Sequence, residues 1–120
     1  MNDNHLKSIQ KFKELNISLS ELRKQIPPEL FKRCDAPAIV TREDVKRLLD
    51  QVLKNNLSKQ ALLEWVNTVM FDEIFDYDED SSDCIASIIS ELEEADERDG
   101  VLSDSNIRKY LDCLAKNVEL

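Results

Sequence analysis

Residues 41–70, TREDVKRLLDQVLKNNLSKQALLEWVNTVM, decide the fold because they hold two helical patterns joined by a short polar break. Thr41 and Ser58 stand where the N-caps of these two helices are expected. The apolar positions recur at helical spacing: Val45, Leu48, Leu49, Val52 and Leu53, then Ala61, Leu62, Trp65, Val66, Val69 and Met70. Because only about three residues separate the patterns, the helices are predicted to pack antiparallel as an αα-hairpin.

Trp65 is the single tryptophan of the chain. Tryptophan is enriched at the centres of protein interfaces, so an exposed Trp65 would be an anchor for a partner. Its spacing from Leu62 and Val69, however, places it within the apolar stripe of its helix, and that spacing favours a position in the core.

The segments on both sides of the hairpin continue the helical pattern. Further helices are predicted at residues 4–15, 19–25, 28–33, 82–97 and 104–116. One glycine and three prolines are too few for the many turns of an all-β fold. The predicted fold class is all-α: a single domain over residues 1–120, built as a helical bundle of about five to seven helices with short loops. Residues 1–3 and 117–120 are expected to fray.

The net charge of −9 is unevenly distributed. Residues 1–60 contain 12 Lys and Arg against 8 Asp and Glu, whereas residues 61–120 contain 4 against 17. Lys7, Lys11 and Lys13 are expected on the solvent face of the first helix. The acidic second half argues against nucleic acid as its partner, because phosphates require Lys and Arg. A basic protein partner fits this charge, and ordinary solubility is the alternative.

The cysteines and the N-terminus predict a cytoplasmic protein. Cys34, Cys84 and Cys113 are scattered along the chain, which is typical of reduced thiols in the cytosol. The N-terminal segment has no apolar core of a signal peptide, and no apolar run approaches the length of a membrane-spanning helix. We therefore expect no membrane association.

Two segments interrupt the helices and are predicted as loops, namely residues 35–38 and the acidic stretch, residues 72–83 (DEIFDYDEDSSD). Asp76, Asp78 and Asp80 match positions 1, 3 and 5 of an EF-hand calcium loop. Ser81 and Ser87 then occupy position 6, where Gly makes the turn, and position 12, where Glu supplies two ligand oxygens. No bound metal or other cofactor is therefore predicted.

The chain has few side chains that could act together in catalysis, and it is predicted not to be an enzyme. His5 is the only histidine, and no nucleophile and base can be paired around it. A single glycine excludes a glycine-rich phosphate loop. Cys34 follows Lys32 and Arg33, which could lower its pKa, but an unreactive, partly buried thiol is the favoured interpretation.

Several of these segments together resemble a known class of proteins. They are the helix start Thr41–Val45, the segment LSKQALLEWVNTV at residues 57–69, the segment FDEIFDYDEDSSD at residues 71–83 and the close DGVLSDSNIRKYL at residues 99–111. Over about residues 40–115 the chain resembles small all-helical bacterial immunity proteins, which neutralise toxins of contact-dependent growth inhibition and related polymorphic toxin systems. The resemblance implies a cytoplasmic inhibitor that binds one cognate basic toxin domain, often a nuclease, and blocks its active site.

The acidic stretch is the predicted partner-binding site. Its acidic members would meet basic groups of the toxin, and its two aromatic residues would fill pockets between them. The predicted residues are Asp72, Glu73, Phe75, Asp76, Tyr77, Asp78, Glu79, Asp80 and Asp83. For the aromatic pair, the alternative is that one ring packs back under the stretch. The alternative functions are an acidic helical adaptor module and a degenerate EF-hand-like sensor. The oligomeric state is left open.

Overall fold

The computed structural model describes residues 3–26, 38–72 and 74–120, which form six α-helices and a small two-stranded sheet. The helices are α1 (Asp3–Lys13), α2 (Leu19–Gln25), α3 (Arg42–Leu53), α4 (Lys59–Phe71), α5 (Ser82–Glu93) and α6 (Asp104–Lys116). The strands are β1 (Ala38–Val40) and β2 (Phe75–Tyr77), and the short 3-10 helices are η2 (Glu79–Ser81) and η3 (Glu94–Asp96). The helical fold class is confirmed, with the sheet as an addition. The helix predicted at residues 28–33 lies outside the described residues.

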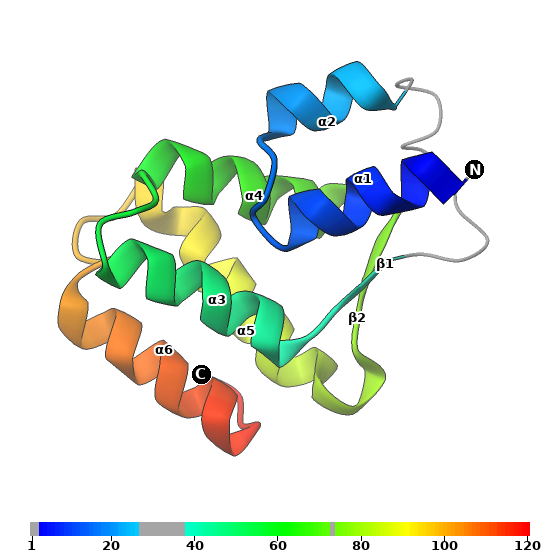
Figure 1. The fold of residues 1–120 in the computed structure, drawn as a ribbon. Coiled ribbons are helices and arrows are strands. Elements are labelled where there is room, and N and C mark those ends of the chain that lie inside the picture. The colour runs from blue at the N-terminus through cyan, green and yellow to red at the C-terminus, as the bar shows by residue number, and fades with distance from the viewer. Residues whose placement is uncertain (1–2, 27–37, 73) are drawn as a thin grey trace.

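The hairpin predicted from residues 41–70 is formed by α3 and α4, which run in opposite directions (Figure 1). Thr41 begins α3 with a capping box, in which the Thr41 side chain and the Asp44 carboxylate each accept a hydrogen bond from the other's backbone amide. Ser58 begins α4 by accepting a hydrogen bond from the amide of Ala61. Asn55, which follows α3, adopts the left-handed conformation with φ of 58°. Asparagine tolerates this conformation, so the local sequence itself ends the helix.

The apolar stripes of all six helices meet in one core. Trp65 is only 1% exposed, and its indole Nε1 donates a hydrogen bond of 3.2 Å to the carbonyl of Lys13 at the end of α1. The core position predicted for Trp65 is therefore confirmed. Other fully buried large side chains include Ile9, Leu22, Leu48, Leu49, Leu62, Ile74, Ile85, Ile88, Ile89 and Leu92.

A parallel pairing between β1 and β2 was not foreseen from the sequence. Ala38 pairs with Phe75, Ile39 with Asp76 and Val40 with Tyr77. Parallel strands require a long crossover connection, and here the α3–α4 hairpin is that connection. The loop predictions for Ala38 and for residues 75–77 are therefore wrong. Three residues per strand are too few for the alternation of inward and outward side chains to stand out in the sequence.

A buried ion pair joins α1, α3 and β1. Lys13 Nζ lies 3.2 Å from Asp44 Oδ2 and donates a hydrogen bond of 2.8 Å to the carbonyl of Ile39. The side chains of Lys13 and Asp44 are only 10% and 5% exposed. Arg47 adds a second contact of 3.0 Å to the other oxygen of Asp44. The prediction that Lys13 lies on the solvent face is therefore wrong, because the last turn of α1 faces this carboxylate.

The C-terminal residues, which were expected to fray, contact the body of the protein. Asn117 ends α6 in the left-handed conformation, and its side-chain amide donates to the carbonyl of Asp80 at 3.1 Å. The backbone amide of Leu120 donates to Ser87 Oγ on α5 at 3.0 Å. The tail therefore lies against the first turns of α5, beside the end of the acidic stretch.

The buried ion pair generates the first prediction. In the variant Asp44→Asn, the ammonium of Lys13 stays buried without its counter-charge, so the free energy of unfolding should fall by about 3 kcal/mol. Urea unfolding followed by circular dichroism measures this loss. The matched control is Asp50→Asn, which removes an exposed partner of Lys54 on the same helix and should change the stability by less than about 0.5 kcal/mol. Equal effects of the two substitutions would contradict the assigned role of Asp44.

Candidate functional site

The acidic stretch is ordered over most of its length rather than forming a loose loop. Asp72 is the C-cap of α4, residues 75–77 form β2, residues 79–81 form η2, and Ser82 begins α5. The carboxylates of the described residues in the stretch therefore project from ordered backbone. Glu73, which was predicted as part of the site, lies outside the described residues.

Most of the acidic side chains of this stretch face solvent, and none forms an ion pair with another described residue. Asp76, Glu79, Asp80 and Asp83 are exposed, and Asp72 and Asp78 are half-buried. None of the ion pairs between described residues includes any of these six carboxylates. The stretch therefore presents a concentration of negative charge that no ion pair among the described residues neutralises.

Several carboxylates at the end of α5 and in η3 form ion pairs with basic side chains, unlike those of the acidic stretch. Glu91 and Glu94 both pair with Arg98, and Asp96 pairs with Lys59 on α4. These ion pairs satisfy much of the charge near the end of α5 and in η3 internally. Glu93 and Glu97 take part in none of the ion pairs between described residues.

Asp72 lies in a less polar setting than its exposed neighbours. Burial raises the pKa of its carboxyl group, and the positive charge of Arg23 on α2 opposes that rise. The environment thus stabilises the carboxylate of Asp72 incompletely. A cationic group supplied by a partner would compensate for the lost hydration, so this residue stands to gain from binding.

The two predicted aromatic anchors do not project freely into solvent. Phe75 is 7% exposed, and its ring packs against that of Phe12 with a centroid distance of 6.1 Å. Tyr77 is half-buried and packs against the core, and burial, followed by the charge of Asp76, raises the pKa of its hydroxyl group. The structure therefore places Phe75 in the core, which is the alternative that the sequence left open for one of the two rings.

Phe71 is the aromatic residue that sequence reasoning missed. It is 67% exposed at the C-terminal end of α4, directly before Asp72. At about 100° per residue, Phe71 lies half a turn around α4 from Leu62 and therefore opposite the buried stripe. Helical geometry alone therefore predicts that Phe71 lies on the exposed side of α4, whereas the sequence-based prediction considered only the apolar face of this helix.

The structure also shows the surroundings of Ser87, which was compared with the last ligand position of an EF-hand loop. Ser87, at the position of the bidentate ligand, lies inside α5, where its hydroxyl donates to the carbonyl of Cys84 and accepts from the amide of Leu120. Within residues 3–26, 38–72 and 74–120, no group of three or more His, Cys, Asp or Glu side chains has an arrangement that could hold a metal ion.

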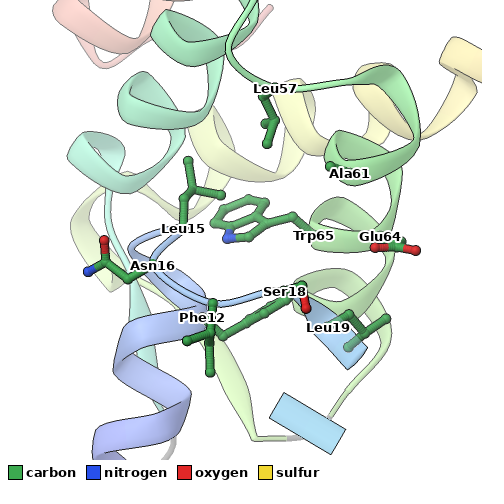
Figure 2. A pocket seen from close by; sticks show the side chains of 10 residues that line it. Phe12, Leu15, Asn16, Ser18, Leu19, Leu57, Ala61, Glu64 and Trp65 are labelled. Carbon is green, nitrogen blue, oxygen red and sulfur yellow. The ribbon is translucent and has the colours of Figure 1, made fainter. Parts of the chain in front are cut away.

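A separate apolar pocket opens beside α4, as Figure 2 shows. It has a volume of about 230 Å³, and its walls come from two stretches that are far apart in the sequence: residues 12–19, from the end of α1 to the start of α2, and residues 57–65, from the loop before α4 into α4 itself. Trp65 forms part of the wall and Glu64 lies beside it on the rim. Because the two stretches meet only in the folded chain, no local sequence pattern predicts this pocket.

Comparison of the chain with protein-family models, with curated proteins and with solved structures finds no match. No helix in the described part of the chain is long and apolar enough to cross a membrane.

The contrast between the two phenylalanines generates the second prediction. Phe75→Ala removes a ring from the core and should lower the free energy of unfolding by about 3–5 kcal/mol. Phe71→Ala removes an exposed ring and should change it by less than about 0.5 kcal/mol. Chemical denaturation of both variants measures the difference. A large loss of stability in Phe71→Ala would show that this ring is packed and not available to a partner.

Proposed function

We propose that this protein is an immunity protein that binds a cognate toxin domain through its acidic surface and blocks the toxin's active site. The observation that carries the proposal is the set of carboxylates in the acidic stretch that form no ion pair with a described residue, held on ordered backbone beside the exposed ring of Phe71. The resemblance of residues 40–115 to small helical immunity proteins supplies the class of partner.

The proposed mechanism is electrostatic capture followed by occlusion. A nuclease binds phosphates with Lys and Arg, so its active site is a basic surface. The exposed carboxylates of Asp76, Glu79, Asp80 and Asp83 would occupy positions that substrate phosphates otherwise take. Their shared sign accelerates the encounter with a basic partner, because charge complementarity acts mainly on the association rate.

Phe71 supplies the apolar part of this surface in the proposal. An exposed aromatic ring beside charged groups is the kind of residue that anchors an interface once water is excluded around it. Phe71 therefore takes the anchoring role first assigned to Phe75, whose ring is engaged with Phe12. Half-buried Tyr77 remains at the edge of the surface.

An acidic helical adaptor is the second candidate function. The open apolar pocket beside α4 favours it, since a pocket of this kind can receive a side chain of a partner helix. An adaptor would bind its partner without suppressing any toxic activity. Survival of cells that express a toxin domain encoded beside this gene, with and without this protein, separates the two functions.

The third prediction concerns charge reversal in the acidic stretch. The triple variant Asp76→Lys, Asp78→Lys and Asp80→Lys should lower the association rate with that toxin domain at least about tenfold at low salt. Surface plasmon resonance at low and high salt measures the rates. The matched control is Glu97→Lys, Asp99→Lys and Asp104→Lys, which changes the net charge equally at exposed positions outside the stretch.

The control variant should lose no more than about twofold in association rate, because most of its charge change lies away from the binding surface. Circular dichroism must first show that both triple variants are folded. If the folded variant of the acidic stretch binds as rapidly as the wild-type protein at low salt, the stretch is not the interface.

A further inference from the structure

The pocket beside α4 combines an apolar wall with a single carboxylate on its rim. Apolar side chains from two stretches of the chain, residues 12–19 and 57–65, form the wall, and the indole of Trp65 lies among them (Figure 2). The apolar members are Phe12, Leu15, Ile17, Leu19, Leu57 and Ala61. The polar side chains at its edge are those of Asn16, Ser18 and Glu64.

Of these polar groups, Glu64 carries the charge. The hydroxyl of Ser18 already accepts a hydrogen bond from the amide of Glu21 as the cap of α2. The carboxylate of Glu64 has no ion pair or hydrogen bond to another side chain in the described part of the chain. Glu64 is half-buried, so a cation that reached the rim would find an acceptor that is partly removed from water.

This combination selects an occupant with an apolar stem and a positively charged end. Among protein side chains, only Lys and Arg have that form, and both bury their stems along apolar surface while the charged end stays at the rim. The carboxylate of Glu64 favours Arg over Lys, since a planar guanidinium pairs with a carboxylate through two parallel hydrogen bonds. A volume of about 230 Å³ leaves room for one such side chain.

The pocket also lies on the same side of α4 as the exposed anchor. Glu64 and Phe71 are seven residues apart, which is nearly two helical turns, so they lie on one face of α4 about 10 Å from each other. One protein partner can therefore cover the rim of the pocket and Phe71 together.

We propose that this pocket receives one arginine side chain of a protein partner, with its guanidinium paired to Glu64 and its stem against the apolar wall. The inference rests on the proposed function for the basic character of that partner. It adds a second contact region, contributed by α1, α2 and α4, to the acidic stretch.

The fourth prediction uses a small probe in place of the partner. N-acetyl-L-argininamide should quench or shift the fluorescence of Trp65 saturably, with a dissociation constant on the order of millimolar. Because Trp65 is the only tryptophan, the signal reports on this pocket. The matched probe N-acetyl-L-citrullinamide has nearly the same shape without the charge and should bind at least about fivefold more weakly.

Two variants locate the probe. Glu64→Gln should reduce affinity for the arginine probe to that for the citrulline probe, and Ala61→Leu, which fills the pocket, should abolish the fluorescence response. Equal binding of the two probes, tighter binding of N-acetyl-L-leucinamide, or no saturable response would each overturn the proposal. Circular dichroism of both variants confirms that they are folded before the titration.

The acidic-stretch variant makes the two proposals separable. The triple Lys variant at positions 76, 78 and 80 should bind the arginine probe within about twofold of the wild-type protein, since those residues do not line the pocket. If the probe binds but charge reversal leaves toxin binding unchanged, the proposed function fails and the pocket assignment stands. If the toxin binds through the acidic stretch but the probe does not bind, only the pocket assignment fails.

Discussion

The buried contact between Lys13 and Asp44 is the constraint on which the candidate surface depends. Asp44 accepts hydrogen bonds from the start of α3, and Lys13 reaches from the end of α1 to both that carboxylate and the carbonyl of Ile39 in β1. β1 in turn pairs with β2, which forms the middle of the acidic stretch. A charge pair in the interior thus fixes the backbone from which the surface carboxylates project. Because both charges are desolvated, the arrangement requires both partners, and neither can be replaced singly without a large cost.

The acidic half of the chain divides into two populations of carboxylates. Those near the end of α5 and in η3 are largely engaged with Arg98 and Lys59, and they contribute to the structure. Those of the acidic stretch are unpaired within the described residues and repel one another. Such a concentration costs stability unless a positive partner compensates for it, whereas solubility alone would be met by charges spread over the surface. The net charge alone does not show this difference between paired and unpaired carboxylates. The difference favours binding of a positively charged partner as the role of the stretch.

Local rules predicted most of the helices because their signals are short-range. Thr41 and Ser58 cap the helices where the sequence placed them, and Trp65 lies in the core as its spacing indicated. The pairing of β1 with β2 and the contact of Lys13 with Asp44 join residues separated by about thirty positions or more, and no local pattern encodes them. The pocket beside α4 is non-local for the same reason. Phe71 is different, since its position opposite Leu62 could have been read directly from helical geometry.

The central claim is that the acidic stretch and Phe71 form the surface that a basic toxin domain covers. Amide chemical-shift mapping of the isotope-labelled protein, free and bound to a basic toxin domain whose activity it suppresses, tests this claim most directly. The account predicts that the largest changes fall on residues 71–83, with a second group at the pocket around Glu64. Changes confined to the exposed faces of α3 and α6, with residues 71–83 unaffected, would contradict it.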